Sequence, residues 1–266
     1  MSSQDGSAAG QPSVRVTSDG PVTAVTIGNG ARYNVLGSRD WTALEQAFGE
    51  LAADERVRVV LLAGQGSSFS AGFNLREWEG ASRDEVDQAF ARMEAACTAI
   101  ERLPVPVVAK VRGVAAGAGC QLALACDLRV ADRAARLGMP VARLGILTSP
   151  SFAARLSLLA GPGVARDLLY TGRLIDALEA QRFGLVTRCV PGSELDQVTA
   201  ALVESIAAQP PAAIRAAKRA VGAGLGPAIE AAQHAAGGSA VAYGEFQHSV
   251  TAFLHGRQPE TPHPDN

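Results

Sequence analysis

The sequence lacks the segments that mark membrane and secreted proteins. No uncharged apolar run approaches the roughly 20 residues that span a bilayer, although 47% of the 266 residues are hydrophobic. The N-terminus begins Met1-Ser2-Ser3-Gln4 and has neither the basic start nor the apolar block of a secretory signal. We therefore expect a cytoplasmic protein without a membrane span, whose first 12 residues form a disordered tail.

Metal-binding and nucleic-acid-binding patterns are also missing. The four cysteines show no metal-ligand spacing, and the four histidines all lie from His234 onward, without an Asp/Glu cluster. The net charge is −2, and no basic block is present. We expect reduced, buried thiols, no metal and no nucleic-acid partner. Only Lys110 and Lys218 are lysines; the other basic residues are arginines, which can bind phosphate through two parallel hydrogen bonds.

Hydrophobic patterning predicts an α/β fold with mostly parallel strands. Apolar runs at 14–17 and 22–27 flank Gly20-Pro21 and predict a hairpin. Further strands are expected at 57–63, 107–111, 128–131 and 185–190. Ser38 is expected to cap a helix over 40–51, and Ser82 or Asp84 one that ends near Leu103. Other expected helices cover 120–126, 152–159, 163–170, 176–183, 195–207, 212–221 and 227–253.

Two stretches of small residues each follow a strand-like run. They are Ser70-Ala71-Gly72-Phe73-Asn74-Leu75 and Gly113 to Gln121, which reads GVAAGAGCQ. Without bulky side chains, the backbone of such segments can approach a ligand closely. Peptide N–H groups from the two turns can then converge on one oxygen atom, which is the arrangement of an oxyanion hole.

A dinucleotide-binding turn is the competing interpretation of the second stretch. That motif needs G-x-G-x-x-G and an acidic residue about 20 positions later. Here the spacing is G-x-x-x-G-x-G, and residues 137–141 contain no acid. We therefore rank nicotinamide binding below the oxyanion-hole interpretation.

Several ordered motifs resemble the crotonase (enoyl-CoA hydratase/isomerase) superfamily. They are Asn34-Val35-Leu36, residues 57–64, Phe69 to Gly72, the Gly117 stretch through Asp127, and Ala217-Lys218. The resemblance runs from about Val14 to about Pro259. It implies a crotonase-like spiral of ββα units over residues 13–200 and a C-terminal helical trimerisation region with a polar tail over 201–266. It also implies an acyl-CoA ligand, no tightly bound cofactor beyond the coenzyme A of the substrate, and a homotrimer or dimer of trimers.

The resemblance also assigns site residues. Ala71 and Ala118 would donate the oxyanion-hole hydrogen bonds, and Gln121 and Val141 stand where hydratases carry two catalytic glutamates. Another subgroup places an Asp near Ser149, which we expect to be a helix cap instead. The expected ligand contacts are Gly72, Gly117 and Gly119 in the turns, Asn34, and basic groups at the nucleotide end, namely Arg32, Lys218, His255 and Arg257.

These replacements leave two function hypotheses open. Neither Gln121 nor Val141 can move a proton at neutral pH, so the resemblance predicts an enolate-stabilising enzyme that hydrates poorly and favours isomerisation or decarboxylation. The alternative is a non-catalytic acyl-CoA binding or carrier protein. Glu77, Glu79 and Glu85 follow the first turn and are candidate replacement acids, although we expect them to be solvated charges.

Overall fold

The computed structural model describes residues 13–30, 33–235 and 238–256, so the expected tail over residues 1–12 lies outside the described residues. Two sheets form its centre. The larger has the strand order β1-β2-β3-β4-β6-β9, and the smaller has the order β5-β7-β8. The strands are β1 (Val14–Asp19), β2 (Val22–Ile27), β3 (Val59–Gly64), β4 (Val107–Val111), β5 (Val114–Ala116), β6 (Leu128–Asp132), β7 (Arg136–Gly138), β8 (Leu174–Asp176) and β9 (Arg188–Val190).

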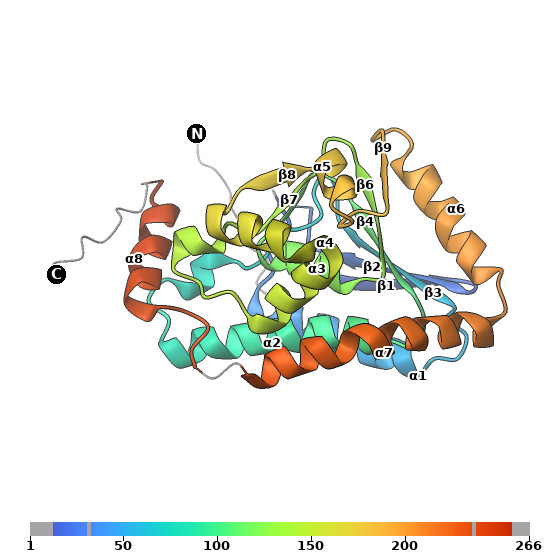
Figure 1. Ribbon diagram of the computed structural model, residues 1–266, viewed down its shortest axis with the longest axis horizontal. Helices are drawn as coiled ribbons and strands as arrows, with labels where there is room; N and C mark the ends of the chain where they lie inside the picture. Colours follow the sequence, from blue (N-terminus) through green and yellow to red (C-terminus); the bar gives the residue numbers. More distant parts are fainter. Residues whose placement is uncertain (1–12, 31–32, 236–237, 257–266) are drawn as a thin grey trace, which may run out of the picture.

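Helices surround these two sheets (Figure 1). They are α1 (Ser38–Ala53), η1 (Leu75–Trp78), α2 (Arg83–Arg102), α3 (Ala118–Ala125), η2 (Pro140–Leu144), α4 (Pro150–Thr171), α5 (Ala177–Arg182), α6 (Leu195–Ala207), α7 (Pro211–Ala235) and α8 (Tyr243–Leu254). None of the helices in the described ranges is long and apolar enough to cross a membrane. The expected domain boundary at residue 200 falls inside α6.

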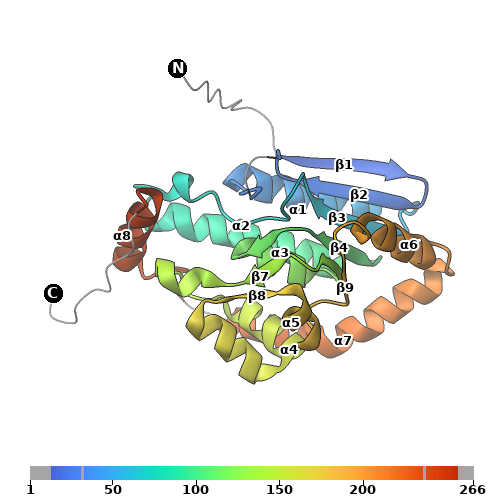
Figure 2. The same cartoon turned by 90° about the horizontal axis from the view of Figure 1, so that it is seen from above.

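The chain visits the two sheets in turn, which builds repeated ββα units. β4 is followed by β5 and α3, and β6 is followed by β7 and the helices after it. β4 then pairs with β6, and β5 with β7, both in parallel. Among the described strand pairs only β1–β2 and β7–β8 are antiparallel. The expected α/β class with mostly parallel pairing is confirmed, and Figure 2 shows the sheets from above.

Both faces of the larger sheet are covered by apolar side chains. Successive residues of a strand point to opposite faces. Val59, Val108 and Val130 therefore face α6, where they form a small core with Leu195 and Leu202. Val60, Val107 and Ala109 face the main core, which also contains Trp41, Phe69, Phe152 and Phe246.

Four sequence expectations about elements are wrong. Gly37, not Ser38, is the N-cap of α1, and its N–H donates to Asp40 at 2.8 Å. The strand expected at 185–190 is only Arg188–Val190, because the Leu185 N–H donates to Ala180 at the end of α5 instead. The helix expected over 212–221 continues through Pro227 to Ala235.

The helix expected over 227–253 is interrupted before α8. Gly238 has φ +119°, and the Ala240 N–H donates to the Asp87 carboxylate at 2.7 Å. Val241 then bridges Ile146 in the loop after η2. α8 consequently folds back onto its own chain, where Phe246 packs against Trp78 with ring centroids 5.4 Å apart.

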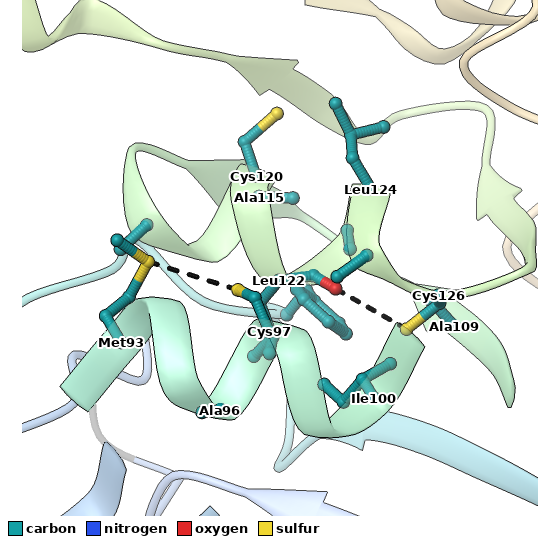
Figure 3. Packing of buried hydrophobic residues seen from close by; sticks show 14 of the residues in the cluster. Met93, Ala96, Cys97, Ile100, Ala109, Ala115, Cys120, Leu122, Leu124 and Cys126 are labelled. Carbon is teal, nitrogen blue, oxygen red and sulfur yellow. Dashed lines mark hydrogen bonds between the residues drawn. The ribbon is translucent and has the colours of Figure 1, made fainter. Parts of the chain in front are cut away.

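The position of α3 matters most for the site. Figure 3 shows α3 lying along α2, with Cys97 facing Leu122. At the far end of α3, the Arg129 side chain donates hydrogen bonds to the carbonyls of Ala123, at 3.2 Å, and Cys126, at 2.6 Å. Arg129 is only 3% exposed. A buried cation there satisfies terminal carbonyls and suits the negative end of the helix dipole.

The thiols of this region are buried, as the sequence predicts. Cys97, Cys120 and Cys126 are free and buried, and Cys189 is partly exposed. Burial raises the pKa of Cys120 and of Cys126 to about 12. Both thiols therefore stay protonated at neutral pH and act as apolar packing groups.

Candidate active site

The two small-residue turns meet in the structure as neighbouring extended segments. The Ser70 N–H donates to Val114 O at 2.9 Å, and the Ala116 N–H donates to Ser70 O at 3.0 Å. On the other edge, the Leu36 N–H donates to Gly72 O at 2.7 Å. The segment 70–74 therefore lies between residues 33–36 and residues 114–118, and it continues the smaller sheet.

Two glycines permit this close contact. A Cβ on Gly119 would lie 2.1 Å from Ser70 O, a distance that side-chain carbons do not reach. A Cβ on Gly72 would lie 2.7 Å from Ala118 N, and Gly72 also has φ +90°. Both positions need glycine because a backbone from the other turn fills the space. Gly117, the N-cap of α3, has φ +55° and donates to Gly138 O at 3.0 Å.

Ala71 does not fit its expected role as a donor. Its N–H donates to Tyr33 O at 2.8 Å, on the side away from the second turn. In a trans peptide the C=O and the next N–H point in opposite directions. Because Gly72 O accepts from Leu36, the N–H of Phe73 must point the other way, toward residues 114–118.

Phe73 is therefore the candidate donor on this segment, and the sequence interpretation missed it. Phe73 is 9% exposed, and its N–H has no hydrogen-bond partner within the described residues. The donor is Phe73 and not Ala71 because one edge of the segment pairs with residues 33–36 and the other edge with residues 114–118. The sequence carries no signal for it, since both residues adjoin the same glycine.

Ala118 keeps its expected position. It is the first residue of α3 and is 5% exposed. The N–H groups of Cys120 and Gln121 donate hydrogen bonds to Gly117 O, at 2.9 and 3.1 Å. The Ala118 N–H has no partner in the described part of the chain and points out of the N-terminal end of the helix. There the helix dipole favours negative charge.

Gln121 and Val141, the two positions at which the resemblance expects glutamates, have different surroundings. Gln121 is 4% exposed, and its buried Oε1 has no hydrogen-bond partner among the described residues. A buried polar atom without a partner is costly, so it is a candidate to hold a ligand or a water molecule. Val141 is 7% exposed and belongs to the first turn of η2, within the main core.

The acidic residues after the first turn have structural contacts. Glu77 accepts a hydrogen bond from the Ser38 N–H at 2.9 Å, at the start of α1. Glu85 and Ser82 form a capping box at the start of α2, and hydrogen bonds from Ser82 lower the pKa of Glu85. Glu79 is exposed.

Glu94 is an acid that sequence reasoning missed. The Ser149 hydroxyl donates to its Oε1 at 2.6 Å. Ser149 is the N-cap of α4, as expected, because its Oγ accepts from the Phe152 N–H at 3.2 Å. In the sequence, Glu94 is one charged position among several on a helix; only the packing of α2 beside α4 distinguishes it.

The side chains of Asn34 and Lys218 link separate segments of the chain through hydrogen bonds. Asn34 is 1% exposed, and its amide donates to Gln65 O and Ser68 O at 2.7 and 2.8 Å. The Lys218 ammonium donates to Val105 O at 2.9 Å and pairs with Asp127 at 2.8 Å. The polar groups of both side chains thus already have hydrogen-bond partners within the chain. The geometry therefore does not support the expectation that these side chains contact coenzyme A.

The remaining basic candidates are less informative. Arg32 and Arg257 lie outside the described residues. His255 is exposed, and its Nδ1 lies 2.8 Å from Thr251 O in its own helix. The described residues contain no group of three His, Cys, Asp or Glu side chains that could hold a metal ion.

Comparison with known proteins agrees with this geometry. A family model described as enoyl-CoA hydratase/isomerase matches residues 17–262. The short-chain-enoyl-CoA hydratase of Clostridium acetobutylicum is 33% identical over 246 residues, covering 91% of this chain and 94% of the relative.

Solved structures are similar over almost the whole fold. An enoyl-CoA hydratase from Mycobacterium avium subsp. paratuberculosis superposes with a TM-score of 0.83 at 26% identity, covering 94% of this chain and 99% of the other. An enoyl-CoA hydratase/isomerase from Pseudoalteromonas atlantica also has a TM-score of 0.83, at 28% identity, with 94% and 100% covered.

Replacing Lys218 tests its bracing role. We expect Lys218→Met to lower the free energy of unfolding by about 1.5–3 kcal/mol, because it removes hydrogen bonds to a charged group. Urea denaturation measures this, with the exposed neighbour Arg219→Met as the control. Affinity for coenzyme A, measured by calorimetry, should not change. A large loss of affinity at unchanged stability would restore the phosphate-contact role.

Proposed function

The chain belongs to the enoyl-CoA hydratase/isomerase family, and on that premise we propose that its two facing turns bind the carbonyl oxygen of an acyl-CoA thioester. The observation that carries the proposal is a pair of N–H groups, from Phe73 and Ala118, that have no partner among residues 13–30, 33–235 and 238–256 and lie on segments in direct contact. The enzymes of this family act on CoA thioesters, which is the class of ligand proposed here.

The two N–H groups would act on charge that develops during the reaction. When a thioester becomes an enolate, its oxygen gains negative charge, and hydrogen bonds to that oxygen then strengthen. Removing one such donor typically costs about 10²–10³ in rate. The N-terminus of α3 adds a favourable dipole at the same place. The Ala118 and Phe73 N–H groups are preorganised, since the sheet and the helix fix both backbones.

Hydration needs more than this electrostatic stabilisation. One group must take a proton from water and another must deliver one to carbon, and each contributes about 10²–10⁴-fold. Gln121 can hold a water molecule but cannot accept its proton, and Val141 can do neither. We therefore propose an enolate-stabilising enzyme with weak hydratase activity. The same two residues favour a second candidate, an acyl-CoA binding or carrier protein without turnover.

A thioether analogue tests the oxyanion hole directly. Butyryl-CoA and S-butyl-CoA differ only in the carbonyl oxygen that the Phe73 and Ala118 N–H groups would bind. Two hydrogen bonds at about 0.5–1.5 kcal/mol each predict binding of butyryl-CoA at least about fivefold tighter. Calorimetry with both compounds measures it, with butyrate as the control for the acyl chain. Equal affinities would argue against these two donors.

Restoring both acids tests the reason for weak hydration. We expect Gln121→Glu with Val141→Glu to raise the hydration of crotonyl-CoA by about 10² or more, and either change alone to do much less, since such residues act as a unit. Gln121→Glu with Val141→Gln is the matched control, equal in side-chain length but with one acid. Fast hydration by the unchanged protein would contradict the assignment of these positions.

We also propose a trimer or a dimer of trimers. α8 packs on its own chain, so exposed apolar residues of α4, β8 and α5 are the better candidates for the contact: Leu158, Tyr170, Leu174 and Leu178 are 43%, 76%, 41% and 40% exposed. Grouped exposed apolar side chains mark interfaces.

Light scattering tests the assembly. We expect a mass of three or six chains of 27.4 kDa. Leu174→Glu should shift that mass toward the monomer, because it buries a charge in the contact. Val16→Glu, on the edge strand β1, is the control and should leave the mass unchanged. A monomeric unchanged protein would refute the proposal.

A further inference from the structure

The contact between Glu94 and Ser149 belongs to a larger polar cluster between α2 and α4. α2 contributes Glu94 and Glu101, which are two helical turns apart and share a face. α4 contributes Arg155, which is 3% exposed and binds Glu101 through Nε at 2.7 Å and Nη2 at 3.0 Å. Ser149 and Ser151 complete the cluster, with their hydroxyls 3.1 Å apart.

The cluster holds one carboxylate more than it holds cations. Glu101 and Arg155 form a bidentate ion pair, so their charges balance. Glu94 has only the Ser149 hydroxyl as a hydrogen-bond partner within the described residues, and its buried Oε2 has none. The Nη1 of Arg155 is also buried without a partner. No cation of the cluster therefore balances the carboxylate of Glu94, and its Oε1 lies next to a hydroxyl that can pass it a proton.

The elements that carry this cluster are neighbours of the elements that carry the candidate site. Figure 3 shows Met93, the residue before Glu94, and Cys97 on the stretch of α2 that lies along α3. Cys97 faces Leu122, the residue after Gln121. Ser149 ends the loop that leaves η2, whose first turn contains Val141, and the Ile146 N–H in that loop donates to Val141 O at 3.3 Å.

Resting on the proposed function, we propose that Glu94 and Ser149 supply the proton transfer that Gln121 and Val141 cannot. The Ser149 hydroxyl exchanges a proton with the carbon next to the bound thioester carbonyl, and Glu94 holds the proton that Ser149 gives up. The reaction so served is α-proton transfer, as in isomerisation, rather than hydration.

In the forward direction, the C–H bond next to the thioester carbonyl breaks. Its electron pair forms the C=C bond of the enolate while the carbonyl π pair moves onto oxygen. The Phe73 and Ala118 N–H groups bind that oxygen. Ser149 Oγ takes the proton as its own proton passes to Glu94 Oε1. The reverse step returns a proton to carbon, with no other reactant consumed.

Exchange with solvent deuterium measures this step. Wild-type protein with butyryl-CoA in D₂O should exchange the α-protons, followed by NMR. We expect Glu94→Gln to lower the exchange rate by about 10² or more, because the amide still accepts the Ser149 hydrogen bond but cannot take its proton. Affinity for butyryl-CoA, measured by calorimetry, should stay unchanged.

Two serine variants provide matched controls. Ser149→Asn keeps an oxygen that can cap α4 but removes the hydroxyl, so exchange should fall as in Glu94→Gln. Ser205→Ala removes a hydroxyl that donates to Leu202 O within α6, outside the cluster, and should leave exchange intact. Ser149→Asn also carries the test if Glu94→Gln fails to fold.

The dependence of the exchange rate on substrate concentration separates proton transfer from a structural role. Glu94→Gln should lower the maximal exchange rate at saturating butyryl-CoA and leave the concentration for half-saturation unchanged. A purely structural Glu94 would instead change the half-saturation concentration or the free energy of unfolding.

Each outcome decides between the proposals. Binding of butyryl-CoA with unchanged exchange in Glu94→Gln would overturn the role of Glu94 while leaving the thioester site intact. Binding by the wild-type protein without any exchange would overturn it in favour of a carrier. Absence of binding by the wild-type protein would instead refute the proposed function.

Discussion

The contact between the two turns is the constraint on which the rest of the structure depends. Ser70 O and the backbone of Gly119 approach so closely that even a methyl group would collide. The same contact fixes the relation of Gly72 to the N-terminus of α3 and hence of the Phe73 N–H to the Ala118 N–H. The sheets, the Arg129 brace and the packing of α2 on α3 all serve to hold these two backbones in register.

In the function proposed here, the backbone and the side chains contribute different parts of the chemistry. Charge stabilisation comes from peptide N–H groups, which survive side-chain substitution, and glycine is needed only where a Cβ would collide. Proton transfer depends on side chains, and these can be supplied from a different helix. We propose that Gln121 and Val141 alter proton transfer in the site while the Phe73 and Ala118 N–H groups keep their positions. In our proposal Glu94 restores part of that chemistry from α2.

Polar residues that look like ligand contacts also hold the scaffold together. Asn34 satisfies carbonyls of the loop that leads into the first turn, and Lys218 ties α7 to the end of α2 and to Asp127. Both are nearly buried, where an unpaired carbonyl would be costly. A motif shared across a family can therefore reflect support of the site as much as contact with the substrate.

Local pattern determined much of the fold. The hairpin of β1 and β2, the strand β4, the Ser82 and Ser149 caps and the small-residue turns all follow from short-range chemistry that the sequence displays. Tertiary structure alone decided which N–H faces the second turn. Successive peptide N–H groups point to alternate sides of the segment, and the hydrogen bond from Leu36 N–H to Gly72 O determines which ones point toward the second turn. It also decided that Glu94 meets Ser149, residues 55 positions apart, since no local pattern encodes the packing of α2 against α4.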